Sequence, residues 1–106
     1  MSLRINTNYM EEENIWLMDI IGEVDIYTAN ELKETLRKML DEHVDNIKIN
    51  CSELTYIDST GLGVLIGALK RLKKENKNII IVNPKQNISK LLKITGLNKI
   101  FILEGE

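Results

Sequence analysis

The sequence has one cysteine, few aromatic residues and no long apolar run, and each of these absences excludes a class of protein. Cys51 has no second cysteine to pair with, so an intramolecular disulfide is excluded and a reducing compartment is indicated. No apolar run approaches the roughly 20 residues that a membrane-spanning helix needs. The N-terminus also lacks the basic and apolar blocks of a signal peptide. These features predict a cytoplasmic protein.

A strong charge of one sign is absent as well. The 106 residues include 14 basic and 16 acidic side chains, which gives a net charge of −2. Because nucleic-acid binding depends on clustered basic residues, this balance argues against direct contact with nucleic acid. The basic run Lys70–Lys74 has helical spacing and is interpreted as a solvated helix face. With 43% hydrophobic residues, the chain predicts one domain over residues 1–106 with a small aliphatic core.

What the sequence does contain is an alternation of strand and helix patterns. From Ile15 onward the predicted order is strand, helix, strand, helix, strand, helix, strand, which is typical of parallel strands joined by right-handed crossovers. Leu3–Tyr9 alternates apolar and polar residues and predicts an edge strand that pairs antiparallel. The fold class is therefore α/β, with a mixed, mostly parallel sheet of four to five strands and about three to four helices. The later strands are expected at Ile15–Ile21, Ile47–Cys51, Ile79–Val82 and Ile100–Leu103, and the helices at Thr28–Val44, Thr60–Glu75 and Asn87–Thr95.

Three local patterns add detail to this prediction. Gly22–Asp25 interrupts the apolar run and is expected to end its strand. Thr28 and Glu31 have the spacing of a capping box, in which both side chains bond to free amides at a helix start. The β-branched run Ile79–Val82 predicts a strand that is buried on both faces.

The order of elements places three loops together. Each strand that leads into a helix leaves the sheet at the same edge, so the loops Gly22–Tyr27, Ser52–Ser59 and Asn83–Asn87 should share one rim. In open α/β sheets, ligands and partners act at this rim. One of the three loops leads into the stretch Asp58–Gly61, which carries two adjacent hydroxyl groups.

Ser59 and Thr60 have two interpretations. One hydroxyl could cap the following helix by accepting an amide hydrogen bond. Two hydroxyls are present where one cap suffices, however, so one would be spare. Gly61 and Gly63 also fall in or near the first helical turn, where each glycine costs roughly 1 kcal/mol relative to alanine. They would allow either close approach of another chain or tight packing of the helix on the sheet.

Catalysis by Ser59 is not supported by the sequence. A serine nucleophile needs a base within hydrogen-bonding reach. The only histidine, His43, lies about fifteen residues along a helix that begins near Thr28, which places it roughly 20 Å from the rim. The residues around Ser59 also lack the elbow pattern of α/β hydrolases.

Nucleotide and metal sites are weakly indicated. Gly61–Gly63 with Gly67 falls inside the predicted helix, and no P-loop lysine follows in the required pattern. A phosphate bound to backbone amides at this helix start remains physically allowed. Asp19, Asp25 and Asp58 have no spacing that requires a metal, so no metal ligands are predicted.

Four stretches resemble one known family. Asp58–Gly63, followed by Val64–Gly67, is similar to the signature of bacterial anti-sigma factor antagonists of the STAS domain family. Gly22–Asp25 resembles the family's first-loop motif, and Thr95–Leu97 resembles its turn before the last strand. The resemblance covers nearly the whole chain and implies the STAS fold. It is closest to antagonists of general-stress partner-switching pathways, with the sporulation type next.

The resemblance implies a binding protein that is switched by phosphorylation. In this family the unphosphorylated antagonist binds an anti-sigma factor that is also a serine kinase, which frees the sigma factor. The kinase then uses ATP to phosphorylate the serine after the Asp, here Ser59, with Thr60 as the less favoured acceptor. A metal-dependent serine phosphatase reverses this step. The implied partner-binding residues are Glu23, Asp25, Asp58, Ser59, Thr60, Gly61, Leu62 and Gly63.

The resemblance further implies no catalysis, no cofactor and a monomer when free. An alternative is a STAS scaffold or ligand-sensing module that no anti-sigma kinase controls. A third hypothesis, a small enzyme, predicts turnover that is lost on Ser59→Ala without any partner present. One departure from the family is the connection Asn83–Asn87, which is slightly longer than usual and blurs the start of the third helix.

Overall fold

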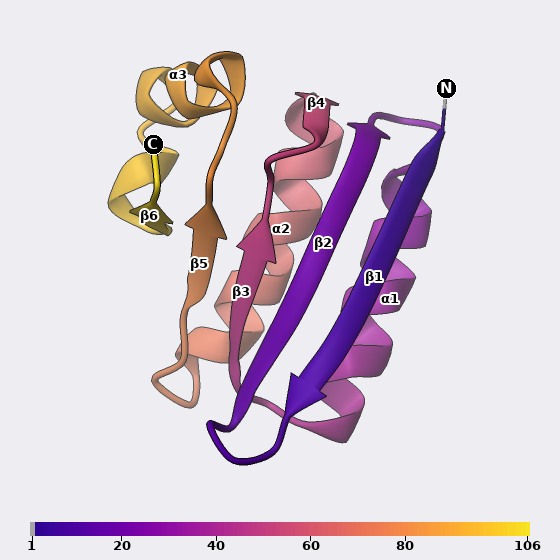
Figure 1. Ribbon diagram of the computed structural model, residues 1–106, viewed down its shortest axis with the longest axis vertical. Coiled ribbons are helices and arrows are strands. Elements are labelled where there is room, and N and C mark those ends of the chain that lie inside the picture. Colours follow the sequence, from indigo (N-terminus) through magenta and orange to yellow (C-terminus); the bar gives the residue numbers. More distant parts are fainter. Residues whose placement is uncertain (1) are drawn as a thin grey trace.

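The computed structural model describes residues 2–106 as a sheet with helices packed against it (Figure 1). Within these residues there are six strands, three α-helices and one short 3-10 helix. The elements are β1 (Leu3–Met10), β2 (Ile15–Val24), α1 (Ala29–Glu42), β3 (Asn46–Asn50), β4 (Leu54–Ile57), α2 (Ser59–Lys73), β5 (Ile79–Val82), α3 (Gln86–Ile94), η1 (Leu97–Lys99) and β6 (Ile102–Glu104).

The sheet is mixed and mostly parallel, as predicted. Its strand order is β1-β2-β3-β5-β6, and β4 pairs with the last residues of β2 beyond the end of β3. β1 runs antiparallel to β2, with Leu3 opposite Gly22 and Met10 opposite Ile15, and the other pairs are parallel. The six strands exceed the predicted four to five because β4 forms within the stretch predicted as the loop Ser52–Ser59.

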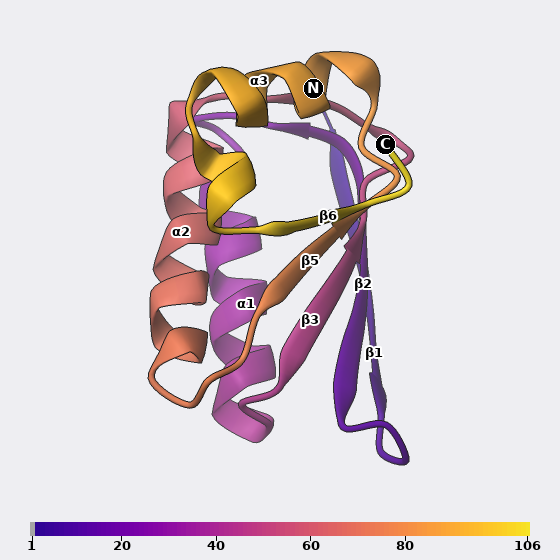
Figure 2. The ribbon, with the colours of Figure 1, turned by 90° about the vertical axis from the view of Figure 1, so that its left-hand side faces the viewer.

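All three helices lie on one side of the sheet. Figure 2 shows α1 and α2 side by side against this face, with α3 across its upper end, while the opposite face is open. The connections β2–α1–β3, β4–α2–β5 and β5–α3–β6 all step in the same direction along the sheet. Right-handed crossovers that step in one direction place their helices on the same face. The core therefore forms between the helices and a single face of the sheet.

The prediction of a strand buried on both faces was wrong. Ile79 and Ile81 are buried against the helices, whereas Ile80 and Val82 alternate with them and are only half-buried. Leu17 of β2, on the same open face, is 37% exposed. A run of β-branched residues indicates a strand, but the burial of its second face depends on where the helices pack.

β2 is longer than predicted and continues through Gly22 to Val24. Gly22 has φ +105°, and a Cβ at this position would lie 2.2 Å from the carbonyl oxygen of Ser2. The strand pairing shifts in register between Gly22 and Glu23. The glycine therefore permits a bulge within the strand and does not end it. The extension places Val24 at the rim, next to the start of α2.

The helix predictions are confirmed apart from shifts of a few residues at their ends. The turn after α3 contains Gly96 with φ +77°, a left-handed conformation that favours glycine and ends the helix. Cys51 is buried and follows directly after β3. None of the helices in residues 2–106 is long and apolar enough to cross a membrane.

Candidate functional site

Hydrogen bonds tie the predicted rim loops together at the upper end of the sheet in Figure 1. The amide of Asp58 donates to the carbonyl of Val24 at 3.2 Å, which joins the end of β4 to the end of β2. The side-chain amide of Asn87 donates to the carbonyl of Thr55 at 3.1 Å, which joins α3 to β4. The three loops therefore share one rim, as the order of elements predicts.

Asp58 caps the helix that begins at Ser59. Its carboxylate oxygen Oδ1 accepts the amide of Thr60 at 3.0 Å and the amide of Gly61 at 3.1 Å. Ser59 and Thr60 are both exposed, and neither hydroxyl makes a hydrogen bond within residues 2–106. Neither hydroxyl caps the helix, because the carboxylate of Asp58 does so. Both hydroxyls are therefore spare.

The glycines of α2 differ in what surrounds them. A Cβ on Gly61 would lie 2.6 Å from Cγ1 of Val24 and 2.7 Å from Cγ1 of Ile57. Gly61 therefore allows the first turn of α2 to pack closely on β2 and β4. Around Gly63 and Gly67 a Cβ would meet no atom within 4 Å. Tight packing explains Gly61, and openness to another molecule remains for the other two.

Asp25 organises the loop before α1. Only 8% of Asp25 is exposed, and its Oδ1 accepts the amides of Tyr27 at 2.9 Å and Thr28 at 3.1 Å. The Thr28 hydroxyl accepts the amide of Asp25 at 2.9 Å and donates to the carbonyl of Glu23 at 3.0 Å. The predicted capping box was therefore wrong, because Thr28 bonds backward into the loop and not to the amides of α1. The role of Asp25 in partner binding stays a prediction.

The predicted partner-binding residues are not equally accessible. Ser59, Thr60 and Gly63 are exposed, whereas Gly61 and Leu62 lie on the buried side of α2. Leu62 belongs to the hydrophobic core. The remaining three are Glu23 and Asp58, which are half-buried, and Asp25, which is buried.

Three exposed apolar residues at the rim were missed by the sequence analysis. Ile26 and Tyr27, in the loop before α1, are 69% and 87% exposed, and Tyr56 of β4 is also exposed. Exposed bulky side chains of this kind are common where proteins bind one another. The sequence contains a pattern that could have indicated them. Two large apolar residues directly follow Asp25 in a segment that has neither a helical nor a strand periodicity.

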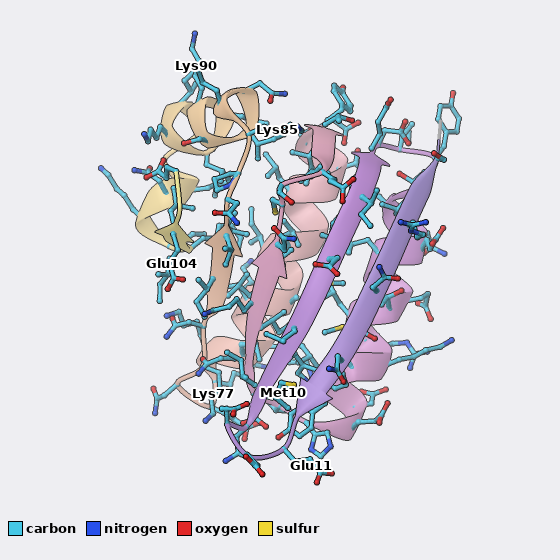
Figure 3. All side chains as sticks on the ribbon, in the orientation of Figure 1. Met10, Glu11, Lys77, Lys85, Lys90 and Glu104 are labelled. Atoms are coloured by element: carbon cyan, nitrogen blue, oxygen red, sulfur yellow. The ribbon has the colours of Figure 1, made fainter. Side chains whose placement is uncertain are left out.

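The only histidine lies at the opposite end of the molecule. His43 stacks on Tyr9 with ring centroids 3.7 Å apart, and its carbonyl accepts the indole N–H of Trp16 at 2.9 Å. Tyr9 neighbours Met10, which Figure 3 shows at the lower end of the sheet, far from Lys85 and Lys90 at the upper end. His43 is therefore out of reach of Ser59 and cannot act as its base. Within residues 2–106 no group of His, Cys, Asp and Glu is arranged to hold a metal ion.

Comparison with known proteins agrees with this architecture. A family model described as the STAS domain matches residues 6–105. The chain belongs to the STAS domain family. Anti-sigma-B factor antagonists from Staphylococcus epidermidis and Staphylococcus aureus are each 35% identical to it over 95 residues, covering 90% of this chain and 88% of the relative. The predicted family and fold are confirmed.

A solved structure of an anti-sigma factor antagonist, SpoIIAA, shares the fold. SpoIIAA in its unphosphorylated form has a TM-score of 0.78 to this chain, with 20% identity, and the match covers 99% of this chain and 90% of that one. The Bacillus cell fate determinant SpoIIAA in its phosphorylated form has a TM-score of 0.71 at 20% identity, covering 99% of this chain and 93% of that one.

Proposed function

We propose that this protein is an anti-sigma factor antagonist that phosphorylation of Ser59 switches off. Unphosphorylated, it binds an anti-sigma factor that is also a serine kinase and thereby releases the sigma factor. The observation that carries the proposal is the accessibility of the Ser59 hydroxyl. Its hydroxyl is exposed at the start of α2 and makes no hydrogen bond to the rest of residues 2–106, because Asp58 makes the capping bonds. Its Staphylococcus relatives, which are anti-sigma-B factor antagonists, support the same assignment.

The charges around Ser59 suit a switch of this kind. Phosphorylation adds about −1.5 to −2 charges at a rim that already carries Asp58 and Glu23. The amide end of α2 offsets part of that repulsion within the protein. A kinase surface that fits the unphosphorylated rim has no such compensation, so the added phosphate repels it. That SpoIIAA shares this fold in both its unphosphorylated and phosphorylated forms supports a fold that tolerates the phosphate.

In this proposal the protein is a ligand and a substrate, and the partners carry the chemistry. The kinase transfers the γ-phosphoryl group of ATP to Oγ of Ser59, and a base of the kinase takes the hydroxyl proton. A metal-dependent serine phosphatase later hydrolyses the phosphoserine. The chain contributes the position of the hydroxyl on a rigid helix end, in the cytoplasm, where kinase and sigma factor are found.

Phosphate mapping tests the proposal. The full chain is incubated with ATP and its candidate anti-sigma kinase, and phosphorylated peptides are identified by mass spectrometry. We expect a single phosphate on Ser59, none on Ser59→Ala, and wild-type labelling of the control Thr60→Ala. Phosphate on another residue would overturn the site assignment. No phosphate, with a kinase shown to be active on another antagonist, would favour the alternative of a STAS scaffold or ligand-sensing module.

A further inference from the structure

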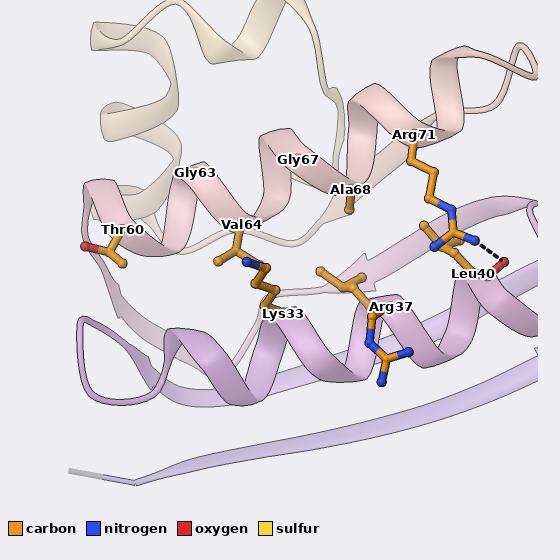
Figure 4. Close-up of a pocket in the computed structure, with 10 residues that line it drawn as sticks. Lys33, Arg37, Leu40, Thr60, Gly63, Val64, Gly67, Ala68 and Arg71 are labelled. Carbon is orange, nitrogen blue, oxygen red and sulfur yellow. Dashed lines mark hydrogen bonds between the residues drawn. The ribbon is translucent and has the colours of Figure 1, made fainter.

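An open groove of about 470 Å³ runs between α1 and α2, and the proposed switch does not account for it (Figure 4). Its lining comes from α1 between Lys33 and Leu40 and from α2 between Thr60 and Arg71. Thr60 lies at one end of the groove, directly after Ser59. Arg71 lies at the other end, near the last turn of α2. The groove therefore extends away from the rim along the length of both helices.

The floor of this groove is apolar. Leu36 and Leu40 of α1 are buried beneath it, and Val64 and Ala68 of α2 are half-buried beside them. The α2 wall is low because Gly67 has no side chain and no neighbouring atom fills the space where a Cβ would lie. A partner side chain could thus reach the apolar floor without displacing any part of the protein.

Every charged residue that lines the groove is basic. Arg37 pairs with Glu34 and Asp41, each at 2.9 Å, and Arg71 pairs with the same Asp41 at 2.9 Å. The Arg71 guanidinium also holds the pKa of the Asp41 carboxyl below its usual range. These pairs are exposed, so they contribute little stability and can exchange for carboxylates of a partner.

Lys33 is the cation that remains available. It has no ion pair among residues 2–106, and Figure 4 shows its side chain extending from α1 toward Val64 on α2. Lys33 therefore lines the groove together with the apolar residues of its floor. A ligand that fits would combine apolar groups facing the floor with acidic groups facing Lys33.

The dimensions of the groove favour a helix as the occupant. Thr60 and Arg71 are eleven residue steps apart, which is roughly 17 Å at 1.5 Å per residue, or about three helical turns. Amphipathic helices bind in such grooves through apolar residues spaced three and four apart. The helix α3 of a second copy would not supply acidic groups, because α3 contains no Asp or Glu and exposes Lys90 and Lys93. Figure 3 shows Lys90 pointing into solvent.

We propose that the groove between α1 and α2 binds an acidic amphipathic helix of the kinase that acts on Ser59. This inference rests on the proposed function and adds a second contact to it. The rim senses whether Ser59 carries a phosphate. The groove supplies affinity and partner choice, and it positions the kinase next to Ser59 through Thr60.

Binding by groove variants is the first test. The full chain is titrated with the same anti-sigma kinase by calorimetry, using Gly67→Trp to fill the groove and Lys33→Glu to reverse its charge. Each should weaken binding about tenfold or more. The matched control is Lys70→Glu, an equal charge change on an exposed residue of α2 that does not line the groove, and it should bind within about twofold of wild type. Circular dichroism confirms that each variant is folded.

The results separate this inference from the proposed function. Wild-type binding with unchanged affinity of Gly67→Trp and Lys33→Glu would overturn the groove assignment and leave the Ser59 switch intact. Equal losses in Lys33→Glu and Lys70→Glu would indicate general charge repulsion and also overturn it. Absence of wild-type binding would remove the proposed function, and the groove assignment with it.

Cross-linking tests the nature of the occupant. A carbodiimide joins an amine directly to a carboxylate without a spacer, so it reports contact between Lys33 and an acidic residue. In the wild-type complex we expect Lys33 to be linked to Asp or Glu on a helix of the kinase, and we expect Gly67→Trp to lose that link. A complex that forms without any link at Lys33, or with a link to a loop, would contradict the acidic helix.

Discussion

At the scale of the residue, the carboxylate of Asp58 caps α2 and leaves the hydroxyls of Ser59 and Thr60 without a structural role. Asp58 accepts the amides of Thr60 and Gly61, so the hydroxyl of Ser59 has no part in holding the helix end. In a serine that capped the helix, phosphorylation would modify the same oxygen that accepts the capping bond, so the switch would be coupled to the helix end. Separating the cap from the acceptor allows Ser59 to change charge while the helix end stays formed.

Alanine substitutions at Asp58, Ser59 and Thr60 should show which side chain stabilises the helix end. We expect Asp58→Ala to lower the free energy of unfolding by about 1 kcal/mol, because two amides lose their acceptor. Ser59→Ala and Thr60→Ala should each stay within about 0.5 kcal/mol of wild type. Urea denaturation followed by circular dichroism measures all three. A loss in Ser59→Ala as large as that in Asp58→Ala would show that the serine also supports the helix end.

Charge at Ser59 should control partner binding without unfolding the protein. Ser59→Asp is expected to bind the kinase about tenfold or more weakly, because it adds a carboxylate beside Asp58. Ser59→Asn has nearly the same shape without the charge and should bind close to wild type. Calorimetry at two salt concentrations measures both, and the loss in Ser59→Asp should shrink at high salt. Comparable binding by the two variants would argue against charge repulsion.

At the scale of the element, α2 has two differently built faces. Gly61 meets the ends of β2 and β4 through Val24 and Ile57, whereas Gly67 faces the open groove. Glycine in a helix is unfavourable, so each needs a reason. Packing supplies the reason for Gly61, and a partner at the groove would supply it for Gly67.

Alanine at these two positions should have opposite effects. Gly61→Ala places a methyl group against Val24 and Ile57 and should destabilise the protein by about 1–3 kcal/mol. Gly67→Ala adds a methyl group in open space and should stabilise the helix by about 0.5–1 kcal/mol. Thermal denaturation of both variants gives the sign directly. A fall in melting temperature for Gly67→Ala would mean that the groove closes on that residue.

Elements with a long apolar period were predictable from the sequence, and short or context-dependent features were not. The stripe of α1 and the alternation of β1 repeat often enough to fix element type. β4 has only four residues, buried at Leu54 and Ile57, and this pattern does not alternate. The position of Ser59 at the rim followed from element order. The cap by Asp58 did not, because Ser, Thr and Asp are all good helix caps and only geometry chooses among them.

At the scale of the whole molecule, the hydrophobic core lies between one layer of helices and one face of the sheet. Cys51 lies in that core, where its amide donates to the carbonyl of Val82 at 2.8 Å and joins the end of β3 to β5. Burial raises the pKa of the Cys51 thiol to about 12. A buried, neutral thiol in the middle of the structure can report whether the molecule opens as a unit.

Thiol labelling should follow global unfolding. At pH 8 the native protein should react with a thiol reagent far more slowly than the urea-unfolded chain, because the thiolate is both buried and scarce. The informative variant is Leu72→Ala, which lies in α2 and should cost about 2–5 kcal/mol. If Cys51 reacts only when the whole molecule opens, its labelling rate should rise about tenfold for each 1.4 kcal/mol lost. A rate unchanged in Leu72→Ala would mean that β3 and its connection to β4 open locally, and the molecule would then not unfold as one unit. Cooperative unfolding would instead show that the fold links the core to the rim, so that Ser59 and the groove are held by the same structure.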